Sequence, residues 1–448
     1  MKTTPQVLKG MRDFLPARMI LRHWVIEQVR RVFERFGFEP LETPAIEYLE
    51  VLEGKNGAEA DKLIYSFEDR GGRRVGLRYD LTVPLARVVA MYPELPKPFK
   101  RYQIGPVWRA ERPQRGRYRE FYQCDADIVG SASMLADAEV VTVAYQALRQ
   151  LGFTRFQILI NNRKLIQAVG TRLAVPAERV PLLWRAIDKW EKIGPAGVRA
   201  ELLESGFDPS TIDRLLGILD VPADTADTLS ILSDRLGDIP LGAEGIRELE
   251  ELLGYLDLLE VPADFTRVDP RMVRGLDYYT GPIFEIVVEE PRIGSISGGG
   301  RYDHLVGLLG PVEAPAVGIS LGLERLIDVI DELGMAPAEV RSTVTEVLVT
   351  VFDQERLASS LAIAASLRAA GINTEVALET EKLGHQLRYA GRKNIPLAII
   401  VGPDEEAAGV VIVRNMVTGQ QERVERGALL GAIQEALDET AEAGLSAD

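Results

Sequence analysis

The sequence predicts an α+β domain with a mostly antiparallel sheet and a helical insertion, followed by a C-terminal α/β domain. Three observations predict this fold class. Strand-like segments alternate with short helical ones from Tyr65 to Phe156, apolar residues at helical spacing fill about 163 to 262, and strand and helix patterns alternate again after Thr345. We therefore expect a first domain over residues 1 to 340 and a second over 341 to 448.

The first domain opens with an amphipathic helix. Its apolar residues recur at helical spacing over 18 to 36, and Gly37 follows as a C-terminal cap. The predicted strands are RRVGLRYDL, FKRYQIGPVW, REFYQCDADIV, FTRFQILI, GPIFEIVVEE and AVGISLG. In the insertion, Asp208 and Pro209 start a helix, because an aspartate caps free amides and proline suits the first turn. The segment LERLIDVIDEL is predicted to be the helix that closes the domain.

The second domain shows a regular order of elements. The strand EVLVTVF, the helix ERLASSLAIAASLRAAG, the strand NTEVAL, the helix LGHQLRYAGRK and the strand PLAIIVG follow one another, before a hairpin in GVVIVRNMVTGQQERV and a final helix. This order predicts a compact α/β module of about 100 residues, which is a common domain size.

Composition excludes several classes of protein. A net charge of −15 argues against general phosphate neutralisation, so any contact with nucleic acid must be local. Cys124 is the only cysteine and the three histidines are scattered, so neither an internal disulfide nor a Cys/His metal site is expected. Apolar stretches fall short of the roughly 20 residues of a membrane-spanning helix, and the N-terminus has no apolar signal core. We expect a cytoplasmic protein without membrane contact.

The segment VWRAERPQRGRYREFYQCDAD gathers polar residues that have chemical uses. If 102 to 111 and 120 to 128 are paired strands, the two-residue period of side chains puts Arg109 and Glu111 on one face. The same period puts three residues of the second strand on one face: Phe121, Gln123 and Asp127. A cation, a carboxylate, an aromatic ring and an amide then converge. This combination suits a nucleotide whose adenine stacks on the ring.

The connection RPQRGRYR is suited to phosphate. Gly116 lets it turn, and guanidinium groups make paired hydrogen bonds to phosphate oxygens. The alternative is a charged hairpin on a wet sheet. We favour a binding site, because polar residues that share a sheet with Ile104, Val107 and Ile128 need partners when they are buried.

The segments RGLDYYTGPIFEI and SISGGGRYDHL form a second candidate region. Arg274 and Asp277 crowd a turn with Tyr278 and Tyr279, and the triplet 298 to 300 predicts a sharp bend that lets another backbone approach. The triplet matches neither a P-loop nor a dinucleotide-binding fingerprint, and an ordinary glycine-rich hairpin is the alternative. The neighbouring arginine and tyrosines favour a site.

A third segment, AVGISLGLERLIDVI, runs from a short strand through Gly322 into a helix. Arg325 stands in the first turn of that helix, where a cation is mildly disfavoured. An anionic partner, which the exposed backbone amides would also favour, explains the arginine better than a chance surface charge does.

Together, these segments resemble motif 2, the histidine-specific signature and motif 3 of the histidyl-tRNA synthetase family, which belongs to class II of the aminoacyl-tRNA synthetases. TPAIEYLE around Pro44 is similar to motif 1, and RGLDYYTG and GGGRYD are specific to the histidine enzymes and their close relatives. The resemblance covers essentially the whole chain, from LKGMRDFLP to the C-terminal module, which resembles the family's anticodon-binding domain.

The resemblance implies a class II catalytic core and a histidine–tRNA ligase activity. Its substrates would be ATP, L-histidine and the histidine tRNA, with Mg²⁺ accompanying ATP, and the family's habit implies a homodimer. One alternative is a regulatory paralogue of histidine biosynthesis, which typically lacks the C-terminal module and loses active-site arginines; here both are kept. Another is a non-catalytic RNA-binding relative.

The resemblance also implies roles for individual residues. Histidine would be bound by Asp80, Leu81, Thr82, Arg109, Gln123, Asp127, Arg274, Tyr278 and Tyr279. ATP would be bound by Arg109, Glu111, Arg117, Phe121 and Arg325. The catalytic groups would be Arg109, Arg274 and Arg325, and the acceptor end of the tRNA would meet Gln114 and Arg119.

Two contacts define the implied choice of amino acid. Asp127 and Tyr279 would hold the two imidazole nitrogens, while Asp80, Thr82 and Gln123 would bind the α-amino group. Much of the bacterial family has glutamate where this chain has Asp80 and Asp127. The shorter side chains change the reach of each carboxylate but keep its chemistry.

Overall fold

The computed structural model describes residues 4–54, 62–113, 116–222, 224–273, 278–291, 293–338 and 340–445. Contacts divide the chain into two compact units. The first comprises residues 1–12 and 25–334, and the second comprises residues 13–24 and 335–448.

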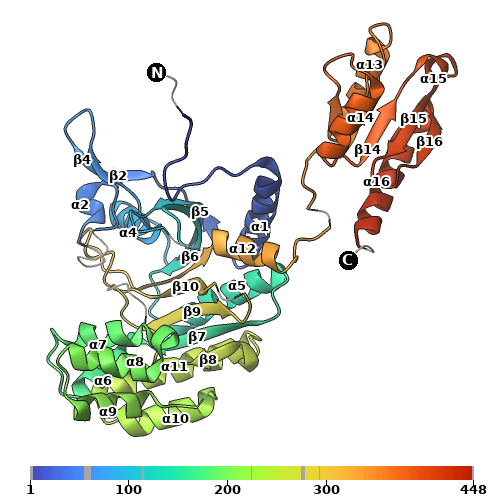
Figure 1. Cartoon of the computed structure of the whole chain (residues 1–448). Coiled ribbons are helices and arrows are strands. Elements are labelled where there is room, and N and C mark those ends of the chain that lie inside the picture. The colour runs from blue at the N-terminus through green and yellow to red at the C-terminus, as the bar shows by residue number, and fades with distance from the viewer. Residues whose placement is uncertain are drawn as a thin grey trace. The chain divides into compact units, whose positions relative to one another are not determined.

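A large sheet forms the centre of the first unit (Figure 1), and its described strands run in the order β1-β5-β6-β11-β10-β9-β7-β8. Their bounds are β1 Glu39–Pro40, β5 Phe99–Trp108, β6 Glu120–Val129, β7 Phe156–Asn162, β8 Thr266–Val268, β9 Pro282–Val288, β10 Ser295–Arg301 and β11 Ala316–Gly322. The pairs β1–β5 and β7–β8 are parallel, and the other neighbours are antiparallel. The predicted mostly antiparallel sheet is therefore confirmed.

A smaller sheet and several helices complete the first unit. The small sheet has the order β2-β4-β3, with bounds β2 Ile46–Tyr48, β3 Ser66–Glu68 and β4 Arg74–Leu77. The helices beside the sheets are α1 Pro16–Arg35, which begins in the second unit, α2 Leu49–Leu52, α4 Thr82–Met91, α5 Met134–Gln150 and α12 Leu323–Glu332.

Between β7 and β8 the chain is helical. These helices are α6 Arg163–Arg172, α7 Val180–Ile187, α8 Trp190–Glu204, α9 Pro209–Leu219, α10 Thr225–Leu236 and α11 Pro240–Leu258, followed by the 3₁₀ turn η1 Ala263–Phe265. They gather in one group beside β7 and β8 (Figure 1). The predicted start of α9 is confirmed, because the Asp208 carboxylate accepts a hydrogen bond of 3.0 Å from the Thr211 amide.

Strand β6 separates the apolar core from a polar face. Its even-numbered residues Cys124, Ala126 and Ile128 are buried and apolar, and α5 packs against this sheet. Its odd-numbered residues from 121 to 127 are aromatic or polar and point to the other face, since side chains alternate along a strand. The polar face is where a site can form.

The second unit contains an α/β module with its own core. Its sheet has the order β13-β12-β14-β15-β16, parallel across the first three strands and antiparallel beyond them. The elements are β12 Val347–Val349, α13 Leu357–Ala369, β13 Thr374–Val376, α14 Leu383–Arg392, β14 Leu397–Ile400, α15 Pro403–Ala407, β15 Val410–Asn415, β16 Gln421–Glu425, η2 Arg426–Ala428 and α16 Leu429–Leu445. The predicted order of strands and helices is confirmed.

Across the described part of the whole chain, every helix is too short or too polar to cross a membrane.

Candidate active site

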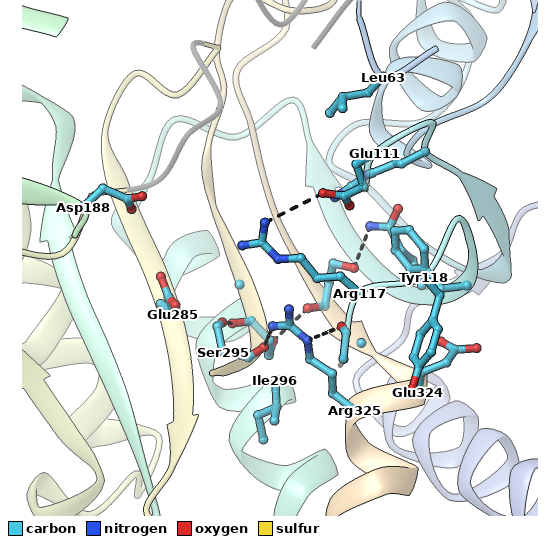
Figure 2. A pocket seen from close by; sticks show the side chains of 18 of the residues that line it. Leu63, Glu111, Arg117, Tyr118, Asp188, Glu285, Ser295, Ile296, Glu324 and Arg325 are labelled. Atoms are coloured by element: carbon cyan, nitrogen blue, oxygen red, sulfur yellow. Dashed lines mark hydrogen bonds and ion pairs between the residues drawn. The ribbon is translucent and has the colours of Figure 1, made fainter. Parts of the chain in front are cut away.

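A cavity of about 450 Å³ opens on the polar face of the large sheet (Figure 2). Six residues that the sequence singles out line it: Arg109, Glu111, Arg117, Phe121, Gln123 and Arg325. They come from the connection between β5 and β6, from β6 itself and from the start of α12. Residues far apart in the chain thus meet around one volume that is large enough for a small substrate.

The walls of the cavity near β6 hold a cation over an aromatic ring. The guanidinium carbon of Arg109 lies 5.0 Å from the centre of the Phe121 ring, and Nε donates a 3.0 Å hydrogen bond to the Tyr79 carbonyl. The predicted strand over 102 to 111 is displaced toward the C-terminus, because β5 runs from Phe99 to Trp108. Arg109 and Glu111 nevertheless line the same cavity.

Two further arginines extend into the cavity. Figure 2 shows Arg117 and Arg325 pointing into it, with Arg117 beside Glu111 at 3.7 Å. Nε of Arg325 donates to the Gly116 carbonyl at 3.0 Å, and its Nη1 contacts the Ser295 carbonyl. Burial, and then the nearby charge of Arg117, lowers the pKa of Arg325. An anion placed between these cations would relieve their repulsion.

The glycine triplet lies in the middle of β10, so the predicted sharp bend is wrong. The triplet pairs with β9 on one side and with β11 on the other. The expected close approach of backbone is present: a Cβ on Gly299 would stand 2.0 Å from the Gly318 carbonyl oxygen. Gly298, on the polar face, lines the cavity and leaves its floor open.

Beyond the cavity, the same face of β6 continues into a buried polar cluster. Nε2 of Gln123 donates to the Ser320 hydroxyl at 2.8 Å and lies 3.4 Å from the Asp125 carboxylate. Oε1 of Gln123 is buried and has no hydrogen-bond partner among the residues that the structure describes. Burial, and next the charge of Asp127, raises the pKa of Asp125 to about 7. This cluster can bind a polar ligand, because it holds an unsatisfied acceptor.

Asp127 is held on both of its oxygens. Its Oδ2 forms an ion pair of 2.9 Å with Nη2 of Arg101, and its Oδ1 accepts a 2.5 Å hydrogen bond from the Tyr302 hydroxyl. Burial raises the pKa of Asp127, while Arg101 and the Tyr302 hydroxyl oppose that rise. Asp127 does not line the 450 Å³ cavity; it lies further along β6 from Gln123.

The start of α4 borders this cluster. Oδ1 of Asp80 accepts a 3.0 Å hydrogen bond from the Val83 amide, and the Leu81 carbonyl accepts one of 3.1 Å from Arg101. Thr82 is also buried, and its side chain is hydrogen-bonded to Tyr278. Three neighbouring residues expected to bind histidine are therefore anchored beside the cluster.

An aromatic group stands on the other side of the cluster. The ring centres of Tyr278 and Tyr279 are 4.9 Å apart, and those of Tyr278 and Tyr302 are 5.7 Å apart. Burial raises the pKa of both Tyr278 and Tyr302 well above the usual value, so both hydroxyls keep their protons at neutral pH. They can donate hydrogen bonds.

Arg119 is tied to the N-terminal segment. Its Nε donates to the Glu111 carbonyl at 3.1 Å, its Nη1 donates to the Lys9 carbonyl at 3.2 Å, and its amide donates to the Gly10 carbonyl at 2.9 Å. Two other expected site residues, Arg274 and Gln114, lie outside the described residues.

Sequence reasoning missed Arg101, Asp125, Ser320 and Tyr302. Asp125 follows the same two-residue period as Gln123 and Asp127, so the alternation of side chains along the strand could have identified it. Arg101 stands directly across from Asp127 in the pairing of β5 with β6, and that register is not visible in the sequence.

The fold and the site define a class of protein. A mostly antiparallel sheet with arginines around one cavity, and a buried polar cluster beside it, is the arrangement that the resemblance implies for a class II aminoacyl-tRNA synthetase. Residues 10–326 match the histidyl-tRNA synthetase family, and residues 346–436 match the anticodon binding domain family. The chain belongs to the histidyl-tRNA synthetase family.

Named relatives agree with this family. The histidine–tRNA ligase of Aeropyrum pernix is 44% identical over 435 residues, covering 97% of this chain and 98% of that protein. That of Cytophaga hutchinsonii is 40% identical over 442 residues, covering 94% and 97%. The crystal structure of histidyl-tRNA synthetase from Nostoc aligns with a TM-score of 0.84 at 32% identity, covering 97% of this chain and all of that one.

Proposed function

We propose that the protein is a histidine–tRNA ligase. It joins histidine to ATP as histidyl-adenylate, with release of pyrophosphate, and then transfers histidine to the 3′-terminal ribose of its tRNA. The observation that carries this proposal is the convergence of Arg109, Arg117 and Arg325 on one cavity next to the buried cluster around Asp127. Membership of the family supplies the choice of amino acid.

The first step needs placement and charge neutralisation more than a base. The histidine carboxylate is already an anion at neutral pH; its oxygen forms a bond to the α-phosphorus of ATP while the bond to the pyrophosphate oxygen breaks. In the second step a terminal ribose hydroxyl attacks the activated carbonyl carbon, and AMP leaves. Preorganised guanidinium groups stabilise the negative charge that develops in the first step.

The arginines divide this task by position. Arg109, fixed between the Tyr79 carbonyl and the Phe121 ring, faces the carboxylate and α-phosphate region. Arg117 and Arg325 meet the outer phosphates, and Glu111 and Phe121 hold the adenine. Arg274 is proposed to act with Arg109. The mutual repulsion of the cations favours the bound triphosphate, because its charge is complementary.

The cluster beyond Gln123 takes the amino acid. Asp127 and Tyr279 bind the two imidazole nitrogens, and Asp80, Thr82 and Gln123 bind the α-amino group. Oε1 of Gln123, which lacks a partner within the described part of the chain, supports this role, since an ammonium group can donate to it. A site that hydrogen-bonds a substrate group can reject analogues without it by roughly 10⁴-fold or more.

Magnesium is proposed to enter with ATP. No group of three or more His, Cys, Asp or Glu among the described residues could hold a metal ion by itself. Magnesium commonly needs only one or two carboxylates together with substrate phosphates, and Glu285 and Glu324 line the cavity that the arginines share. The donor set therefore fits a phosphate-borne ion, which Glu285 and Glu324 would help to hold and which would supply positive charge beside the phosphates.

The tRNA is proposed to contact both domains. Gln114 and Arg119 face its acceptor end, and the module over 346–436 reads its anticodon. A net charge of −15 favours recognition by stacking and base-edge hydrogen bonds over a broad basic surface. We further propose a homodimer located in the cytoplasm; a monomer mass in light scattering would contradict the dimer.

One experiment tests the proposed activity. Exchange of labelled pyrophosphate into ATP should be measured with each of the twenty amino acids in turn. Exchange with histidine alone is expected, followed by charging of histidine tRNA. No exchange with any amino acid would favour a regulatory or non-catalytic relative, and exchange with a different amino acid would refute the substrate.

A further inference from the structure

Arg101 is a buried cation at the junction of two parts of the proposed histidine pocket. Its side chain has 0% exposure and lies on β5 directly across from Asp127 on β6. Burying a charge is costly unless it is paired, so the Arg101 guanidinium needs a partner of opposite charge. Asp127, at 2.9 Å, is that partner.

The guanidinium group also reaches the start of α4. Its Nη2 donates to the Leu81 carbonyl at 3.1 Å, between Asp80 and Thr82. One nitrogen therefore connects the carboxylate on β6 with the backbone that carries two expected contacts to the α-amino group. If Arg101 were removed, both sides of the pocket would lose this common anchor.

Asp127 keeps an acceptor available despite its two contacts. Among the described residues, Oδ2 makes the ion pair with Arg101 but no hydrogen bond of good geometry, while Oδ1 accepts from Tyr302. A carboxylate oxygen has more than one lone-pair direction, so Oδ2 can still accept an N–H from a ligand. Oδ2 is the stronger acceptor while the carboxylate is ionised, because protonation removes part of the acceptor capacity of the group.

The surroundings oppose that ionisation. Asp127 is buried, and burial raises its pKa. Asp125 lies two residues away on the same face, and the charge of Asp127 helps to raise its pKa. Arg101 is the cation that opposes the effect of burial on Asp127, and the Tyr302 hydroxyl assists it. Without Arg101, the pKa of Asp127 would rise further.

We propose that Arg101 is a positioning residue for amino-acid selection: it holds the Asp127 carboxylate in place and ionised, so that Asp127 can accept a hydrogen bond from the imidazole ring of histidine. This inference rests on the proposed function and deepens it. Arg101 acts through Asp127 and needs no contact of its own with the substrate. Its loss therefore acts on histidine and spares ATP.

The test compares Arg101→Met with the full-length wild type in histidine-dependent pyrophosphate exchange between pH 6 and pH 9. We expect the KM for histidine to rise by at least about 10-fold, because hydrogen-bond pairing to the ring is lost, while the KM for ATP changes by less than about 3-fold. The ratio of variant KM to wild-type KM should increase as the pH falls, because Asp127 becomes protonated at a higher pH in the variant.

Two further variants control for folding. Arg101→Lys keeps a positive charge but loses the guanidinium fork, so it should raise the KM for histidine less than Arg101→Met does. Lys164→Met removes a partly buried cation from its pair with Glu248 on α11 and should leave both KM values unchanged. Thermal unfolding of each variant separates loss of fold from loss of binding. If Arg101→Met does not fold, Arg101→Lys carries the same test.

The outcomes separate this inference from the proposed function. A wild type without histidine-dependent exchange refutes the proposed function. An active wild type and an Arg101→Met variant with unchanged KM for histidine refutes only the role of Arg101. Equal increases in both KM values, in a ratio independent of pH, would show a general structural role and also overturn the inference.

Discussion

Asp127 lies over Gly318, so closely that a Cβ on this glycine would stand 1.9 Å from the carboxylate oxygen Oδ1. The two residues are direct neighbours in the pairing of β6 with β11. Arg101 and Tyr302 fix the carboxylate, and it cannot move aside without breaking those contacts. The Asp127 carboxylate can therefore occupy its position only if residue 318 is a glycine.

Gly318→Ala should displace the Asp127 carboxylate. We expect histidine-dependent pyrophosphate exchange to fall by about 10²-fold, since a misplacement of about 1 Å can cost that much. Gly254→Ala on α11 is the matched control, because a Cβ there meets nothing within 4 Å. The control should keep full activity and gain up to about 1 kcal/mol in unfolding free energy. Full activity in Gly318→Ala would contradict the packing argument.

Removal of the arginines should affect the chemical step. Arg325→Ala and Arg274→Ala are each expected to lower exchange by about 10²-fold or more, as the loss of a group that stabilises transition-state charge does. Steady-state exchange at saturating histidine and ATP measures this effect. Arg31→Ala, an exposed arginine on α1, should change nothing. Near-normal exchange in either site variant would remove that arginine from the mechanism.

Arg119 has two opposed interpretations, and one variant distinguishes them. The resemblance implies a contact with tRNA, whereas the structure shows its guanidinium bonded to the Glu111 and Lys9 carbonyls. If its main role is to brace the loop beside the cavity, Arg119→Ala should reduce pyrophosphate exchange and tRNA charging by the same factor. A loss confined to charging, with normal exchange, would instead favour direct contact with tRNA.

The buried Asp125 should make stability depend on pH. Burial and the charge of Asp127 raise its pKa to about 7 in the folded protein, against about 3.9 in the unfolded chain. Between these values the folded state holds a proton that the unfolded state has lost, so stability decreases as the pH rises through this window. Above about pH 7 the contribution of the protonated carboxyl is gone.

Asp125→Asn imitates the protonated carboxyl and tests this pH dependence. Relative to the wild type, the variant should gain at most about 3 kcal/mol of stability between pH 5 and pH 8, because the wild type loses about 1.4 kcal/mol for each pH unit from pH 5 up to the pKa of about 7. Urea unfolding at the two pH values measures this gain. Asp257→Asn, on the exposed surface of α11, should show the same small effect at both pH values. An equal effect of both variants would contradict the raised pKa.

Much of the fold was predictable because the sequence patterns that indicate its helices and strands are local. The helical spacing in α1, the Asp208 cap of α9 and the alternation in β6 are each visible within about twenty residues. The glycine triplet was misread, because glycine favours bends in general and a central strand tolerates it only where neighbouring backbone approaches. That neighbour, Gly318, is 19 residues away from Gly299.

The site was predictable in part. The motifs identify Arg109, Phe121 and Arg325, which the structure brings to one cavity. Arg101 carries no motif, and its importance depends on the register that sets it across from Asp127. A buried arginine in a strand and an exposed one look the same in sequence, so three-dimensional pairing was needed to tell them apart.

Glycines also determine how this pocket could change. Gly298 and Gly318 place main chain, rather than side chains, on the polar face of the central strands. Any substitution of either glycine adds a side chain, and that side chain would occupy space in the pocket. Attempts to engineer acceptance of a bulkier amino acid should therefore alter side chains at the rim, such as Tyr278 or Thr82, and leave the two glycines as they are.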